Sequence, residues 1–272
     1  MRSLPLVALL LLAACAAPES AEPEAPMTVA VDYAPVETKA DSVALAALNA
    51  SGGEAALAAM RYLRFDFGFE RGGQSSVSRQ HLWDRVTGRY RAEWEGGTDS
   101  TYVVLFNTND YEAGQAYLNG TPVAEEENDD LVFRAYRSYI NDTYWLLFPA
   151  KLLDPGVERE YLADSSNAER DVITLAFEGV GLTPGDTYWV YTDKATGQVT
   201  QWAFRLQNGQ PTAAPRFYTW SDYQELSTPE GPVYMSARKA SLDGSFALLT
   251  DGLAAPASVD DAVFTDPTTP LG

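Results

Sequence analysis

Residues 186–206 read DTYWVYTDKATGQVTQWAFRL, and this stretch decides the fold class. Aromatic and β-branched residues alternate with other residues on both sides of Asp193–Gly197, a period of two that predicts strands. Aspartate accepts local backbone hydrogen bonds and glycine adopts positive φ, so the five central residues suit a tight turn. The stretch is therefore predicted to form a β-hairpin rich in aromatic side chains.

A loop from Lys194 to Gly197 determines the expected pairing across this hairpin. It places Trp189 opposite Trp202, and side chains along each strand then alternate between the two faces. One face is expected to carry Trp189, Tyr191, Trp202 and Phe204, and the other Tyr188, Gln201, Ala203 and Arg205.

The same turn pattern, Asp-x-x-Thr-Gly, occurs earlier in the chain at Asp84–Gly88. Pairing by the same rule sets these residues opposite each other: Trp83 and Tyr90, His81 and Ala92, Arg79 and Trp94. Both hairpins are thus predicted to collect their aromatic rings on one face of a sheet.

Strand patterns fill most of the remaining chain, and two helices accompany them. Tyr62–Glu70 is the clearest strand, because its apolar residues alternate with polar ones. Asp41 is expected to cap a helix that runs to Met60 and is interrupted near Gly52, and a second helix is expected from about Asp129 to Ile140. The connections are too short for helical crossovers, so the predicted fold is mainly β with helices (α+β), with about ten or eleven antiparallel strands.

The N-terminal residues resemble those of a bacterial lipoprotein. Arg2 precedes a short apolar run, and Leu12-Ala13-Ala14-Cys15 matches the lipobox, so residues 1–14 are expected to be a signal peptide and Cys15 the lipidated first residue. Residues 15–38, rich in Ala, Pro and Glu, are expected to form a disordered tether. A single domain is expected over residues 39–255 and a C-terminal tail over 256–272, where Val263 and Phe264 can dock.

The net charge of -19 argues against nucleic acid as a partner, because an acidic surface repels phosphates. Adaptation to high salt is one interpretation of this charge, and an ordinary soluble extracytoplasmic domain is the other. The acidic run Glu125–Asp130 is interpreted as a solvated helix start rather than a cation site, since no glycine-turned ligand loop is present. One cysteine excludes an intramolecular disulfide.

The lipobox, the strands and the run Tyr144-Trp145-Leu146-Leu147-Phe148-Pro149 together resemble the Lol-type lipoprotein carrier superfamily. The resemblance covers roughly residues 41–250. It implies a curved antiparallel half-barrel with helices on its concave side and a cavity between them that takes acyl chains. Soluble carriers of this type lack a lipid anchor, so a shuttling role does not follow. The expected cavity lining is Leu63, Phe65, Phe67, Phe69, Trp83, Tyr90, Trp94, Trp189, Tyr191, Trp202 and Phe204; taken singly, each side chain could equally be ordinary core.

The functional hypothesis is a membrane-anchored lipoprotein that binds a lipid or acyl chain, acts without catalysis or a cofactor, and is monomeric. Its expected place is the bacterial cell envelope, on the outer membrane facing the periplasm, with surface exposure as a variant. One alternative is an interaction lipoprotein with a filled core. Another is an enzyme that uses His81, the single histidine, although no nucleophile elbow, phosphate loop or metal-binding cluster accompanies it.

Overall fold

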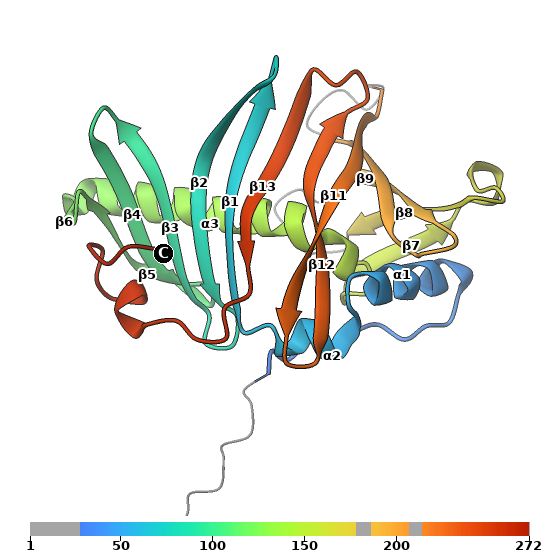
Figure 1. Cartoon of the computed structure of the whole chain (residues 1–272), viewed down its shortest axis with the longest axis horizontal. Coiled ribbons are helices and arrows are strands. Elements are labelled where there is room, and N and C mark those ends of the chain that lie inside the picture. Colours follow the sequence, from blue (N-terminus) through green and yellow to red (C-terminus); the bar gives the residue numbers. More distant parts are fainter. Residues whose placement is uncertain (1–27, 178–185, 207–213, 272) are drawn as a thin grey trace, which may run out of the picture.

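One antiparallel sheet forms the body of the protein in the computed structural model, which describes residues 28–177, 186–206 and 214–271 (Figure 1). Within these residues the sheet has thirteen strands rather than the expected ten or eleven. Its strands are β1 (Tyr62–Arg71), β2 (Gln74–Asp84), β3 (Arg89–Gly97), β4 (Ser100–Asn107), β5 (Asp110–Leu118), β6 (Thr121–Pro122), β7 (Val157–Tyr161), β8 (Arg170–Phe177), β9 (Thr187–Asp193), β10 (Val199–Arg205), β11 (Arg216–Thr228), β12 (Gly231–Ser241) and β13 (Phe246–Ala254).

The strand order divides the sheet into two wings that meet at its centre. It runs β6-β5-β4-β3-β2-β1-β13-β12-β11-β10-β9-β8-β7, so each wing is a simple meander and β1 pairs with β13 between them. The strands β6 and β7 lie at opposite edges, and the curved sheet is not closed. The predicted class, a curved antiparallel sheet with helices, is confirmed.

Helix α3 (Glu125–Leu147) connects the wings and crosses the width of the sheet (Figure 1). Val132 and Ala135 near its start pack on β3 and β4, and Leu146 near its end joins the main core. The three glutamates of the acidic run lie in its first turn, where carboxylates suit the positive end of a helix. The helix is longer than predicted, because the apolar stretch after Ile140 continues it until a 3-10 turn, η1 (Phe148–Ala150), that contains Pro149.

Two short helices, α1 (Lys39–Ala50) and α2 (Gly53–Ala59), cover the lower part of the sheet in Figure 1. The cap of α1 is Thr38 rather than Asp41, which lies three residues into the helix and completes a capping box with it. The predicted interruption is confirmed at Gly52, whose φ is +117°. A Cβ there would lie 2.5 Å from the carbonyl oxygen of Pro232, so this position requires glycine.

The C-terminal segment packs on the outer side of β1–β3. The expected docking of Val263 and Phe264 is confirmed, because both are buried in η3 (Asp261–Phe264) against Tyr62 and Leu82. Arg91 is 1% exposed and donates to the backbone carbonyls of residues 263, 266, 267 and 269. Another 3-10 turn, η2 (Ala163–Ser165), follows β7.

Residues 28–37 also contact the domain, although they fall within the expected tether. The amide of Val29 donates to the carbonyl of Ala58 and that of Ala34 to the carbonyl of Leu153, both at 2.8–2.9 Å. Cys15 and the signal peptide lie outside the described residues.

The register of the Asp193 hairpin differs from the prediction. Trp202 lies opposite Val190, and Trp189 lies opposite Ala203, because a bulge at Thr200 shifts the pairing by one residue. Trp189 and Tyr191 therefore occupy the face opposite to Trp202 and Phe204. Val199 and Trp202 are three residues apart and both are buried in the same core, which an unbroken strand could not achieve.

The Asp84 hairpin follows the predicted pairing more closely. Trp83 lies opposite Tyr90 and His81 opposite Ala92, as expected. The ladder between β2 and β3 ends at Gln80 and Glu93, one residue short of the predicted pair Arg79 and Trp94.

Candidate functional site

A cavity of about 780 Å³ lies along α3, between this helix and strands β8 to β11, and Arg79 of β2 also borders it. The helix contributes one broad face, since Asp130, Arg134, Arg137, Asn141 and Trp145 follow each other at spacings of three and four and the other lining residues of α3 lie next to them. The complete lining is Arg79, Asp130, Phe133, Arg134, Arg137, Ser138, Ile140, Asn141, Asp142, Tyr144, Trp145, Phe177, Tyr188, Trp202, Phe204, Leu206 and Arg216.

Aromatic rings form the wall where α3 approaches β9 and β10. The ring of Trp145 lies 4.4 Å from that of Trp202, which in turn stacks on Phe148 at 4.4 Å. Tyr188 stacks on Trp202 at 5.5 Å and Phe204 borders both. Such rings present large rigid apolar surfaces, which suit contact with a hydrocarbon chain.

The side chains near the mouth combine apolar and basic character. Phe133 is 45% exposed and Leu206 is 40% exposed. Arg134 and Arg137 from α3 and Arg216 from β11 border the same space. The cavity thus has an aromatic wall and a mouth that carries guanidinium groups.

A buried polar cluster ties α3 to the sheet at the cavity's edge. His81 is 0% exposed; its Nε2 lies 3.1 Å from Oδ2 of Asp142, and its Nδ1 lies 2.9 Å from the hydroxyl of Tyr90. Because a carboxylate only accepts, Nε2 carries the proton and Nδ1 accepts from Tyr90. Arg79 adds a bidentate pair to Asp142, at 2.6 and 3.1 Å.

The electrostatics of this cluster favour neutral histidine beside ionised aspartate. Burial lowers the pKa of His81 and outweighs the opposite effect of Asp142. Burial opposes the ionisation of Asp142, but the hydrogen bonds from His81 and Arg79 outweigh it, so the pKa of Asp142 is lowered. The neighbouring Ser78 accepts from Arg79 rather than contacting the imidazole. This arrangement positions a helix, and His81 has no exposed surface with which to meet a substrate.

Of the eleven side chains predicted to line a ligand cavity, Trp202 and Phe204 border this one, and the contact of any of the eleven with a ligand stays a prediction. Leu63, Phe65 and Phe67 are fully buried in the main core, with Phe69 packed against it. Trp83, Tyr90 and Trp94 pack against the first half of α3. Trp189 and Tyr191 lie on the opposite face, where Arg205 and Arg170 cover their rings at 5.5 and 5.3 Å.

Sequence reasoning did not assign the basic residues of the cavity. Arg134 and Arg137 lie one helical turn apart in a helix that begins with three glutamates, and that local reversal of charge was the available signal. Tyr144 and Trp145 stood out as part of an aromatic run, but a helix was not predicted there, so their common direction with Arg137 could not be inferred.

Neither a metal centre nor a membrane-spanning helix is found in the described part of the chain. No three histidine, cysteine or carboxylate side chains gather there closely enough to hold an ion. None of the helices over residues 28–177, 186–206 and 214–271 combines the length and the apolar character needed to cross a bilayer.

Comparison with known proteins gives similarities of structure. No family model matches the sequence. No curated protein matches it either. A DUF1329 family protein from Desulfovibrio piger is similar in structure, with 7% identity and a TM-score of 0.45 over 84% of this chain and 98% of that chain.

Two further solved structures are similar to this chain. An outer membrane lipoprotein-sorting protein domain from Vibrio parahaemolyticus has 12% identity and a TM-score of 0.42, covering 82% of this chain and 94% of its own. A LolA superfamily protein from Nitrosomonas europaea has 10% identity and a TM-score of 0.35, covering 85% and 99%. At these values function has to be inferred from the cavity itself.

Proposed function

We propose that this protein is a membrane-anchored bacterial lipoprotein that binds a hydrophobic ligand, a lipid or an acyl chain, between α3 and the sheet. It would serve lipid or lipoprotein handling in the cell envelope without catalysing a reaction. The observation that carries this proposal is the cavity, whose 780 Å³ falls within the roughly 300–1,000 Å³ of small-molecule sites. Its aromatic wall offers contact to a chain, and its exposed Phe133 and Leu206 suit an apolar ligand that enters from the mouth.

The membrane anchor rests on the lipobox that ends at Cys15. A diacylglyceryl group on this cysteine would hold the domain at the outer membrane, facing the periplasm. Mass spectrometry of the N-terminal peptide tests this part separately. An unmodified chain that begins at Met1 would contradict the anchor and leave ligand binding to be judged on its own.

Binding of a neutral twelve-carbon chain, dodecanol, tests the proposal without help from charge. Trp145 and Trp202 line the cavity, so a brominated dodecanol should quench the intrinsic tryptophan fluorescence. The blocking variant is Ser138→Trp, which places a large ring in the cavity from α3. Its matched control is Ser42→Trp, an exposed position on α1 outside the cavity.

We expect saturable quenching in the wild type and in Ser42→Trp, and its loss in Ser138→Trp. Native mass spectrometry of the purified protein should show the same pattern of bound chains. Absence of chain binding in the wild type, or equal binding in both serine variants, would contradict a ligand site in this cavity.

A further inference from the structure

The cavity gathers arginines that have no acidic partner. Arg79 is neutralised by Asp142, but Arg134, Arg137 and Arg216 form no ion pair among the described residues. Arg134 lies over the ring of Trp94 at 4.9 Å and Arg137 over that of Phe133 at 5.8 Å. Within the described part of the chain, neither guanidinium donates a hydrogen bond to another residue, so its N–H donors are available to a ligand.

Arginines in several other places of the described chain use those donors within the protein. Arg91 binds backbone carbonyls, Arg159 pairs with Asp41, and Arg238 pairs with Glu70 through two hydrogen bonds of 2.6 and 2.9 Å. Arg216 has no such contact in the parts of the chain that the structure describes. Three cationic groups thus border a space in which Asp130 is the remaining unpaired acid.

This local charge opposes that of the whole molecule. A protein of net charge -19 repels anions at long range, and the repulsion has to be offset where an anion is to bind. Guanidinium groups bind carboxylate and phosphate through paired hydrogen bonds, and here such groups border a cavity that has an aromatic wall. The aromatic wall therefore suits the hydrocarbon chain of an anionic amphiphile, and the guanidinium groups suit its head group.

We propose that the cavity selects amphiphiles with an anionic head group, a carboxylate or a phosphate, which Arg137 from α3 and Arg216 from β11 hold while the chain lies on Trp145 and Trp202. The proposal rests on the proposed function, since it assigns the head group of the same ligand. Arg134 adds positive charge beside them. Binding is weakened by salt, because these arginines are exposed.

Four twelve-carbon probes with different head groups test this selection below their micelle concentrations: laurate, dodecyl phosphate, dodecanol and dodecyltrimethylammonium. Their dissociation constants follow from tryptophan fluorescence, with inorganic phosphate as a fifth, chainless probe. We expect laurate and dodecyl phosphate to bind roughly tenfold more tightly than dodecanol, as one charge-assisted hydrogen bond would give. The trimethylammonium probe should bind more weakly than dodecanol, and inorganic phosphate should not displace laurate.

The double variant Arg137→Gln with Arg216→Gln should bind laurate as weakly as dodecanol while its affinity for dodecanol is unchanged. Arg170→Gln is the matched control, because its guanidinium also lies over a ring, that of Tyr191, but on the opposite face of the sheet. It should keep the preference of the wild type.

The outcomes separate the two proposals. Equal affinity of the wild type for laurate and dodecanol would overturn head-group selection and leave the hydrophobic site intact. Displacement of laurate by inorganic phosphate alone would also overturn it, because the site would then serve a free anion. If no twelve-carbon probe binds, the hydrophobic site itself is absent.

Discussion

The turns Asp84–Gly88 and Asp193–Gly197 share one sequence pattern and one local structure, but their surroundings differ. In each, the aspartate Oδ1 accepts from the second and third following amides, and the glycine amide donates to the aspartate carbonyl. Both glycines have positive φ, +80° and +77°. The local sequence therefore determines the loop in both cases.

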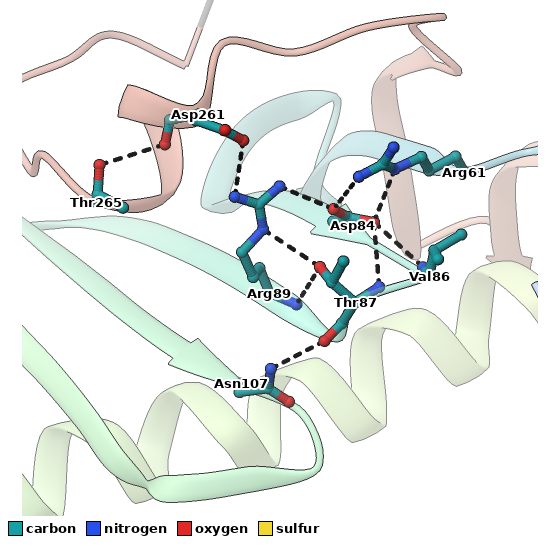
Figure 2. A network of polar contacts seen from close by, with 8 residues as sticks. All are labelled: Arg61, Asp84, Val86, Thr87, Arg89, Asn107, Asp261 and Thr265. Carbon is teal, nitrogen blue, oxygen red and sulfur yellow. Dashed lines mark hydrogen bonds and ion pairs between the residues drawn. The ribbon is translucent and has the colours of Figure 1, made fainter. Parts of the chain in front are cut away.

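The aspartates differ in what their remaining oxygens contact. Asp84 has a fully buried side chain that also binds Arg61 and Arg89, and Arg89 extends the network to Asp261 of the C-terminal segment (Figure 2). Asp193 is satisfied by its own turn, with Thr196 as its further donor. The first turn is thus tied to the fold through its aspartate.

The second turn is tied to the fold through its glycine instead. A Cβ at Gly197 would lie 2.5 Å from the backbone oxygen of Ala46 in α1, whereas one at Gly88 would meet the side chains of Asn107 and Asn109. Beyond the turn, Thr200 bulges and the pairing shifts. A shared motif therefore predicts a shared loop, and tertiary contacts decide the register beyond it.

The largest expected difference in unfolding free energy is between two variants of the bulge residue Thr200. Deletion of Thr200 would force either Val199 or Trp202 out of the core, at about 3–5 kcal/mol of unfolding free energy. The substitution Thr200→Ala keeps the chain length at an exposed position and should change it by about 0.5 kcal/mol or less. Urea unfolding followed by tryptophan fluorescence measures both. Equal stability of the two variants would show that the bulge is incidental.

Substitution of the turn glycines by alanine should destabilise the protein more at the second turn than at the first, whereas substitution of the aspartates should destabilise it more at the first turn. Gly197→Ala combines an unfavourable φ with a clash against helix backbone, for a loss of about 3 kcal/mol, while Gly88→Ala should lose about 1–2 kcal/mol because side chains can move. The same urea titrations decide. A greater loss in Gly88→Ala would reverse this part of the comparison.

Substitution of the two turn aspartates should give the next largest difference in unfolding free energy. Asp84→Asn removes a charge that two arginines share and should lower the unfolding free energy by about 2 kcal/mol at pH 7. Asp193→Asn, in an exposed turn, should have a smaller effect. Thermal unfolding of both variants beside the wild type tests the difference, and comparable losses would show that the arginine network adds nothing to the turn.

At acidic pH, Asp84 should no longer contribute to the free energy of unfolding. Burial opposes its ionisation, but hydrogen bonds from Arg61, Arg89 and Thr87 outweigh it and hold the pKa of Asp84 below its usual range. The stabilisation is therefore complete above the unfolded-state pKa of about 4 and is lost as pH falls below it. The gap in stability between wild type and Asp84→Asn should narrow from pH 5 to about pH 2. A gap that widens on acidification would contradict this sign.

The sequence predicted the parts of the fold that depend on local patterns. Period-two alternation found the strands, and Gly52 marked the break between α1 and α2. The pairing beyond Asp193 could not be predicted, because it depends on Val199 and Trp202 entering one core that other segments complete. A cavity between the helices and the sheet was expected, but most of its lining residues were missed for a similar reason. Its arginines without an ion-pair partner lie on α3 and β11, which the chain brings together only after the sheet has curved around the helix.

The meeting of β1 and β13 at the centre of the sheet has a consequence for the order of folding. Every other pair of neighbouring strands within the described residues is consecutive in the chain. By contrast, Phe67 of β1 pairs with Thr250 of β13, near the other end of the domain sequence. Before β13 has been synthesised, each wing can already form a meander by local contacts. At that stage β1 and β12 have unpaired edges, which can pair with other chains. The slowest step of folding should therefore be the closure of the sheet at its middle, with its outer edges already in place.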